Sequence, residues 1–430
     1  MIKQKFIIFA TQMKTIVQMR IVIHNFGPIK EADIETKRYT VFIGQTSTGK
    51  SVAAKLISIA NDLDFMMLEN GDFKGFVGFL AKYSIDFPFN KDTEIKFFHN
   101  KATWTIRKDS LDQDGEFESI WNTLHSKNIK KKDAYLEMFE DVLSNDYVDA
   151  VSNKMLSDFM QSRLQGKEVN LENFSDFDSR MMYLALRQAN NPVYIPAERI
   201  LISIFTNSIY SLLASETTIP DSIKRFGSLY QKAKSKEKML DIDFMNIIVR
   251  FSKEQDTIHI ANDDVDIDFS KASSGMQSII PMWSVFCYSV NEYRRNIVIE
   301  EPELNLFPTL QVALIKKMIE KIGLSSTNLV ITTHSPYILS VFDNLIYAYD
   351  VYSKALRKMD VEKLERIVKF FSPNGLVCFD DVAAYSFDDN GIVTYINDAE
   401  TRSTGAYALD TASNETTNVF NVLLAIDNEL

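Results

Sequence analysis

The octapeptide GQTSTGKS, which spans Gly44–Ser51, constrains this chain more than any other feature of its sequence. It satisfies the pattern G-x-x-x-x-G-K-[ST]. It lies between an apolar run at 39–43, which predicts a buried strand, and a stretch at 50–60 with the apolar spacing of a helix. In such a loop, backbone N–H groups turn towards phosphate oxygens at the positive end of the helix. Lys50 then reaches the β- and γ-phosphates, and the Ser51 hydroxyl binds Mg²⁺. The predicted phosphate-binding residues are Gly44, Gln45, Thr46, Ser47, Thr48, Gly49, Lys50, Ser51 and Val52.

A second motif lies at 296–308, where an apolar run ends in two consecutive carboxylates (NIVIEEPELNLFP). A strand that ends in this way, at the ligand-binding edge of a parallel sheet, has the arrangement of a Walker B motif. We predict that Glu300 holds Mg²⁺ through its water shell and that Glu301 polarises the attacking water. For either glutamate alone, an acidic helix start after a strand is the simpler interpretation.

Composition excludes several classes of protein. The 47 Lys and Arg residues against 58 Asp and Glu residues give a net charge of −11, which argues against a basic nucleic-acid coat. Cys287 and Cys378 are too few and too far apart for a disulfide framework or a thiolate metal site, as expected in a reducing compartment. Apolar runs such as Phe6–Ala10 fall far short of the ~20 residues of a membrane span. We therefore predict a cytoplasmic protein without a membrane segment.

Strand and helix patterns indicate an α/β fold. Two short strands around a turn at Gly27-Pro28 are predicted within 19–35, and alternation at 93–109 predicts an antiparallel hairpin. Further strand signals lie at 193–199, 257–269, 296–300 and 328–333. Helices lie between the last of these strands, and strands that alternate with helices predict a mostly parallel central sheet covered on both faces.

The other segments have weaker patterns. From about 116 to 250 the apolar spacing is helical but interrupted, which predicts a compact helical insertion and not an unbroken coiled coil. The stretch Ala383–Ile396 predicts a hairpin with a type I′ turn at Asn390-Gly391, and a last helix is predicted at about 415–426.

The order of four motifs, GQTSTGKS, KASSGMQS, IVIEEPE and ITTHSP, resembles the ABC-type ATPase heads of the SMC and OLD (overcoming lysogenisation defect) families, and particularly the small prokaryotic AAA ATPases related to them. The likeness covers most of 19–340. It implies an α/β ABC-type ATPase head: a mostly parallel central sheet flanked by helices, with an antiparallel β region and a helical insertion. The segments expected are an N-terminal extension (1–18), the N-terminal part of the head (19–115), the helical insertion (116–250), the C-terminal part of the head (251–350) and an accessory segment (351–430).

The resemblance also implies a chemical activity. Such heads bind ATP with Mg²⁺ and hydrolyse the ATP, so it implies that Lys50, Glu301 and His334 are catalytic and that Ser51 and Glu300 hold the metal. His334 matches the family's switch histidine, at the end of the strand that follows the paired carboxylates. It would sense the γ-phosphate and brace the water held by Glu301, a role that suits a side chain able to donate and accept hydrogen bonds.

Three further matches concern the contact between two protomers and the surroundings of the site. Ser273, Ser274 and Gly275 match the signature motif, which contacts the nucleotide bound to the other protomer; without the family, they form a helix-capping signal. Glu303–Phe307 matches the D-loop at the dimer seam. Arg199 in YIPAER matches a recurring family feature, for which a phosphate contact and a salt bridge near the site stay open.

The expected assembly is a head-to-tail homodimer with two composite ATP sites. The family likeness further implies a separate effector protein and a role in prokaryotic anti-phage defence. Two alternatives remain: a DNA repair or recombination ATPase of the RecF or SMC kind that clamps duplex DNA, and an ATP-gated scaffold without significant turnover. Two basic stretches, Lys127–Lys132 and Lys232–Lys238, are short and are better explained as solvated helix ends than as DNA contacts.

Overall fold

A computed structural model describes most of the chain outside the predicted insertion. The described residues are 19–66, 68–99, 102–115, 191–205, 219–252, 255–262, 264–292 and 296–405. The predicted N-terminal extension, the helical pattern over 116–190 and the last predicted helix therefore lie outside the described residues. The domain boundaries expected from the sequence stay predictions.

The central sheet has six strands in the order β15-β14-β3-β13-β12-β7, and all neighbouring pairs are parallel except β14 with β15. This confirms the predicted mostly parallel sheet. The strands are β3 (Tyr39–Gly44), β7 (Val193–Ile195), β12 (Asn296–Glu300), β13 (Asn328–Thr333), β14 (Val382–Phe387) and β15 (Val393–Tyr395). Because β3, β13 and β12 are adjacent and parallel, the residues that follow them meet at one edge.

The two faces of this sheet are buried in two separate cores. Alternate side chains of each strand point to opposite faces, so Phe42 packs with helix α2 (Lys50–Ala60) in one core, while Val41 lies in the other. The helices that pack in the second core include α12 (Ser274–Asn291), α13 (Pro308–Ile322) and α14 (Pro336–Arg357). Burial on both faces explains why these strands are nearly continuous apolar runs.

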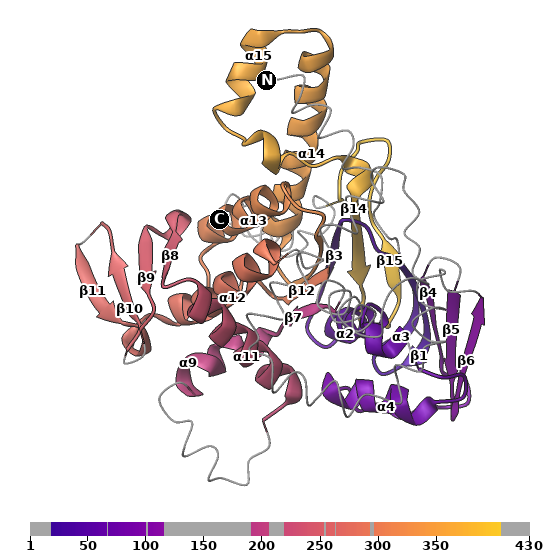
Figure 1. Cartoon of the computed structure of the whole chain (residues 1–430). Helices are drawn as coiled ribbons and strands as arrows, with labels where there is room; N and C mark the ends of the chain where they lie inside the picture. The colour runs from indigo at the N-terminus through magenta and orange to yellow at the C-terminus, as the bar shows by residue number, and fades with distance from the viewer. Residues whose placement is uncertain are drawn as a thin grey trace, which may run out of the picture.

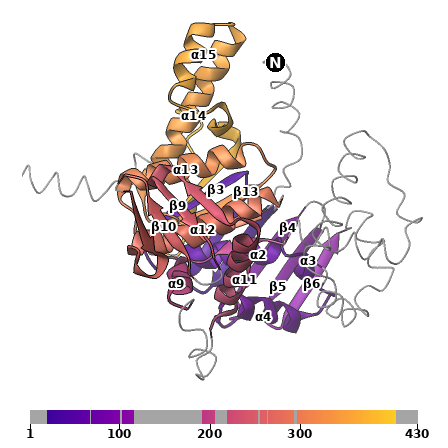
Figure 2. The same ribbon diagram turned by 60° about the vertical axis from the view of Figure 1, so that its left-hand side comes forward.

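A five-stranded antiparallel sheet covers α2 on its other side (Figures 1 and 2). Its strands, in the order β2-β1-β4-β5-β6, are β1 (Met19–Phe26), β2 (Ile29–Glu35), β4 (Glu94–His99), β5 (Ala102–Arg107) and β6 (Ser110–Gly115). Short helices α3 (Leu63–Met66) and α4 (Phe73–Lys82) pack with Trp104 in the same core. Both hairpins predicted from the sequence are confirmed, whereas β6 was not predicted.

A four-stranded antiparallel sheet, ordered β11-β10-β9-β8, packs with the second core. Its strands are β8 (Met239–Ile242), β9 (Ile247–Arg250), β10 (Thr257–Ile260) and β11 (Val265–Asp268). The helical pattern predicted up to 250 is wrong over 239–250: helices α9 (Leu201–Phe205) and α11 (Asp221–Lys236) precede this sheet, and then β8 begins. Asn246, in a left-handed conformation (φ 54°), turns the chain into β9, where pairing with β10 overrides helical spacing.

The C-terminal part of α14 and helix α15 (Val361–Val368) project from the body as a hairpin (Figures 1 and 2). None of the helices in the described part of the chain is long and apolar enough to cross a membrane. Short 3₁₀ helices join other elements; they are η3 (Ala197–Ile200), η4 (Asp243–Met245), η5 (Phe269–Lys271), η6 (Pro373–Gly375) and η7 (Phe379–Asp381).

The hairpin of β14 and β15 is present, but its predicted type I′ turn is not. A type I′ turn needs positive φ at both central residues, and of Asn390 and Gly391 only Gly391 has it (φ 80°). The loop is longer: the Asp388 carboxylate accepts hydrogen bonds from the N–H groups of Asn390 (3.0 Å) and Ile392 (2.8 Å). The Gly391 carbonyl also accepts the Lys30 N–H at 2.8 Å, so contact with β2 shapes this loop.

Candidate nucleotide site

The loop between β3 and α2 has the backbone of an anion cradle. Gly49 is the N-cap residue of α2, with φ 103°, and the helix has neither a side-chain cap nor an acidic residue in its first turn. Its first N–H groups are therefore available to an anion. A Cβ at Gly49 would lie 2.6 Å from Cγ1 of Ile29, so no other residue fits here without a shift. The strand, loop and helix predicted around this motif are confirmed.

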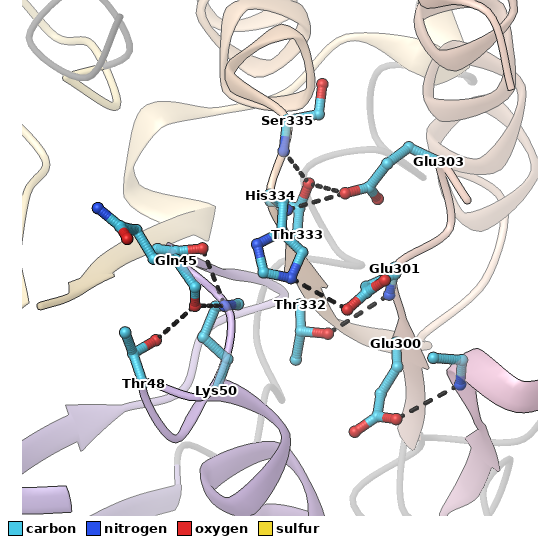
Figure 3. A network of polar contacts seen from close by, with 12 residues as sticks. Gln45, Thr48, Lys50, Glu300, Glu301, Glu303, Thr332, Thr333, His334 and Ser335 are labelled. Atoms are coloured by element: carbon cyan, nitrogen blue, oxygen red, sulfur yellow. Dashed lines mark hydrogen bonds and ion pairs between the residues drawn. The ribbon is translucent and has the colours of Figure 1, made fainter. Parts of the chain in front are cut away.

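Lys50 lies buried inside its own loop. Its ammonium group donates to the carbonyl oxygens of Gly44 (2.9 Å) and Gln45, and the Thr48 hydroxyl donates to the same Gln45 oxygen (Figure 3). Burial lowers the pKa of Lys50 to about 8, although the carboxylates of Glu301, Glu303 and Glu300 oppose the change. To reach a phosphate, Lys50 must exchange these carbonyl oxygens for phosphate oxygens. Val52 is buried in the first core, so only its backbone is available to a ligand.

Two carboxylates at the end of β12, on Glu300 and Glu301, have different surroundings. Glu300 is buried: its Oε2 atom accepts a long hydrogen bond from the Ala197 N–H (3.4 Å), and its Oε1 atom has no hydrogen-bond partner among the described residues. Glu301 is partly exposed and adopts a left-handed conformation (φ 43°), which costs of order 1–3 kcal/mol for a residue other than glycine. Its N–H donates to the Thr332 carbonyl at 2.9 Å.

The loop after β13 brings a histidine to Glu301. The His334 Nε2 atom lies 3.1 Å from Oε1 of Glu301 (Figure 3). The carboxylate of Glu303 accepts from the His334 N–H (2.8 Å) and from the Thr333 hydroxyl, so it fixes the backbone from which the imidazole projects. Burial raises the pKa of Glu303. From the sequence, Glu303 is predicted only as part of the D-loop segment, and no local pattern indicates its contact with the loop after β13.

The structure thus collects residues from three neighbouring strand ends. Lys50 follows β3, Glu300 is the last residue of β12 and Glu301 follows it, and His334 follows β13 (Figure 3). The site therefore combines the loop that carries Lys50, the contact between Glu301 and His334, and the buried Glu300 carboxylate, whose Oε1 atom has no hydrogen-bond partner among the described residues. This arrangement can bind a nucleotide phosphate with a divalent cation and orient a water molecule.

Comparison with known proteins identifies the family. The model of the AAA ATPase domain family matches residues 19–339. The chain belongs to this family. The match confirms, at the level of the family, the resemblance found in the motifs. No curated protein is similar enough to count as a relative.

Solved structures that match the chain include SMC head domains. The SMC head domain from Thermotoga maritima is 11% identical, with a TM-score of 0.33, over 76% of this chain and 92% of that one. An Smc head with an extended coiled coil, bound to the C-terminal domain of ScpA and derived from Pyrococcus furiosus, is 10% identical, with a TM-score of 0.36, over 88% and 95%. An SmcHead bound to the C-winged helix domain of ScpA is 10% identical, with a TM-score of 0.38, over 88% and 96%.

In this AAA ATPase domain the predicted signature residues lie apart from the phosphate loop. Ser273 is the N-cap of α12, and its hydroxyl accepts the Met276 N–H at 3.4 Å, as the capping interpretation predicts. A Cβ at Gly275 would lie 2.9 Å from the Asn305 carbonyl oxygen, so this turn packs on the loop after β12. Ser273 and Ser274 are exposed, and in the described chain no hydrogen bond joins either to the phosphate loop.

Arg199 is a member of the site whose role the sequence left open. It is fully buried, and its guanidinium donates to the carbonyl oxygens of Glu300 and Glu301, both at 2.7 Å, and to that of Pro196 at 3.2 Å. Burial lowers its pKa to about 10. All three partners are backbone carbonyl oxygens. In the described structure Arg199 therefore makes neither the phosphate contact nor the salt bridge that the sequence left open.

Proposed function

We propose that this AAA ATPase domain binds ATP with Mg²⁺ and hydrolyses the ATP at composite sites formed by two copies of the chain. The single observation that carries the proposal is the contact between Glu301 and His334 beside the phosphate loop. A carboxylate held by a histidine, at the carboxyl edge of a parallel sheet, is placed to accept a hydrogen bond from a water molecule. The nearby Lys50 supplies positive charge for a phosphate.

The donor set fits Mg²⁺. In the described part of the chain no three His, Cys, Asp or Glu side chains converge as a metal cage. Mg²⁺ usually keeps several waters and binds through one or two carboxylates together with substrate phosphates. The buried Oε1 atom of Glu300, which has no hydrogen-bond partner among the described residues, would be such a ligand or would accept from the metal's water shell. Ser51 would supply its hydroxyl.

In the proposed mechanism the protein supplies position and charge. Lys50 leaves the carbonyls of its own loop and binds the terminal phosphates, while the N–H groups of the first turn of α2 hold their oxygens. Glu301 orients and polarises water, and His334 keeps the Glu301 carboxylate in place. The metal ion, when bound, neutralises charge that develops on the phosphates. No covalent intermediate on the enzyme is required.

The exposed position of the signature residues supports a head-to-tail homodimer. Ser273 and Ser274 are exposed at the N-terminus of α12, where they present hydrogen-bond donors at the surface. Phe307, at the end of the D-loop segment, is 71% exposed, which is unusual for a large apolar side chain next to a polar site. A second copy would cover this surface and place its signature residues on the nucleotide.

For the biological role we propose that the ATP cycle controls a separate effector protein in anti-phage defence, which rests on the family likeness. The alternative, a clamp on duplex DNA, draws less support from the described residues. In the basic stretch at 232–238, Lys234 is half-buried against Asp256, and Lys236 pairs with Glu292 at 2.7 Å. These lysines are engaged within the chain, and the stretch at 127–132 lies outside the described residues.

Phosphate release and light scattering, each with and without ATP and Mg²⁺, test the proposal. The wild type should form an ATP-dependent dimer and release phosphate. Glu301→Gln should keep the dimer and lose turnover by ~10²-fold or more, because the neutral Gln amide cannot accept a proton from the attacking water as the Glu301 carboxylate can. A wild type that binds ATP and dimerises without turnover would indicate a scaffold and refute hydrolysis.

The biological role has its own test. A strain that carries Lys50→Ala should lose phage resistance if the ATP cycle controls an effector, and full resistance in that strain would contradict the defence role. Affinity for duplex DNA that rises with ATP and falls steeply with salt would favour the DNA clamp.

A further inference from the structure

The starting observation is the unusual backbone of Glu301. Its φ of 43° is rare for a residue other than glycine, and the direction of its side chain depends on this conformation. Two hydrogen bonds hold the peptide groups on either side: the Glu301 N–H donates to the Thr332 carbonyl, and the Glu301 carbonyl accepts from Arg199. A strained conformation persists only where its surroundings determine it.

Arg199 binds two consecutive peptide groups, those of Glu300 and Glu301. One guanidinium nitrogen binds the Glu300 carbonyl and the other binds the Glu301 carbonyl, both at 2.7 Å. The planar fork of an arginine suits two such acceptors, whereas a lysine offers one point charge. Ala197, in the same 3₁₀ helix, donates its N–H to the Glu300 carboxylate. The short segment 196–200 therefore contacts both glutamates of the site.

The same segment continues to the signature helix. Helix α9 follows η3 directly, and its Ser203, which is buried, contacts the side-chain oxygen Oε1 of Gln277 at 3.3 Å. Gln277 lies in the first turn of α12, two residues after Gly275, and its amide donates to the Ser270 carbonyl at 3.0 Å. One covalent stretch of eight residues, 196–203, thus links the signature turn to the turn that carries Glu301.

We propose that residues 196–203 form a bridge in which Arg199 is the positioning residue for Glu301, and Ser203 connects that position to the signature turn of the same chain. The inference rests on the proposed function, since in the composite dimer the signature turn contacts one nucleotide and Glu301 acts on the other. Binding at one composite site then adjusts Glu301 at the second site through this bridge.

The first test replaces the guanidinium group of Arg199 with an ammonium group, which keeps the positive charge but cannot bind two carbonyl oxygens in the same geometry. Arg199→Lys should lower kcat by ~10²-fold, the usual effect of displacing a catalytic group by about 1 Å, while the Kd for ATP and the ATP-dependent dimer mass stay within about threefold of the wild type. Arg402→Lys is the matched control, because Arg402 also makes a two-nitrogen contact, to Asp350, away from the site. Arg402→Lys should leave kcat unchanged.

A second readout does not depend on turnover. Hydrogen exchange of the peptide that covers 296–307 in the full nucleotide-free chain should speed up in Arg199→Lys and not in Arg402→Lys. If the wild type shows no turnover, the proposed function fails, yet this measurement still tests the bridge. Unchanged exchange at 296–307, or a loss of ATP affinity as large as the loss of kcat, would overturn the positioning role.

The Ser203 end of the bridge is tested by a double-mutant cycle. Ser203→Ala alone is a mild change that should keep the fold and lower kcat a few-fold. If the two residues act through one bridge, Arg199→Lys with Ser203→Ala should be no slower than Arg199→Lys alone. Multiplicative effects of the two substitutions would show independent action and overturn the connection to the signature turn.

Discussion

Lys50→Met should raise the stability of the protein and lower its affinity for nucleotide. Lys50 is a buried charge whose proposed partner is a phosphate of the nucleotide. The side chain is 4% exposed, and burial lowers its pKa from 10.5 to about 8. A change of this size corresponds to about 3 kcal/mol of destabilisation at neutral pH, at about 1.4 kcal/mol per tenfold change in proton affinity. Methionine has a similar length and no charge, so it removes this cost.

The stability gained by Lys50→Met is reduced because the substitution removes the hydrogen bonds that Lys50 makes. Its two bonds to the carbonyls of Gly44 and Gln45 contribute about 0.5–1.5 kcal/mol each. We therefore expect Lys50→Met to raise the free energy of unfolding by up to about 2 kcal/mol at pH 7. Urea denaturation followed by tryptophan fluorescence measures this difference. Lys55→Met is the control, because Lys55 lies on the same helix and is only half-buried.

The dependence on pH has a definite sign. The folded chain binds the Lys50 proton less tightly than the unfolded chain, so the destabilisation is complete below pH 8 and disappears as the pH rises towards 10.5. The advantage of Lys50→Met should therefore shrink over this window. ATP with Mg²⁺ should raise the Tm of the wild type and not that of the variant. A variant less stable than the wild type at pH 7, or an advantage equal at pH 7 and pH 10, would refute the reasoning.

Three further substitutions test other parts of the fold. Asp62→Asn should stabilise the protein by about 1–3 kcal/mol at pH 7 and by almost nothing at pH 4, as measured by denaturation at the two pH values. Burial raises the pKa of Asp62 from 3.8 to about 6, so the wild type loses stability as the pH rises through that window. Asn can still accept the hydrogen bond from the Asp64 N–H. Gly275→Ala should reduce ATP-dependent dimerisation in light scattering, because its Cβ would lie 2.9 Å from the Asn305 carbonyl and push the signature turn away from the D-loop, whereas unchanged dimerisation would show that the turn yields freely. Asp388→Ala should lower the free energy of unfolding by about 1 kcal/mol, because two loop N–H groups lose their acceptor, and a change near zero would show that water replaces it.

The phosphate loop and the strands at 239–250 differ in how far the local sequence predicts their secondary structure. The loop motif fixes its own strand, turn and helix, because its glycines and periodic apolar residues act within a few positions of one another. At 239–250 the apolar spacing is compatible with a helix, and pairing of β9 with both β8 and β10 makes this segment two strands. Similarly, the Asn390-Gly391 dipeptide predicts a two-residue turn, but the contact of Gly391 with β2 selects a longer loop.

The sequence alone determined the phosphate loop, the paired carboxylates and the histidine as chemical candidates, because each motif is short and has a mechanism attached to its residue types. Only the tertiary structure decided that Glu301 contacts His334, that Glu303 braces the strand end and that Arg199 holds the Glu301 backbone. These partners lie 31 to 102 residues apart in the chain, so their meeting depends on the order of strands in the sheet. Strand order results from the burial of whole faces against separate cores, which no local pattern encodes.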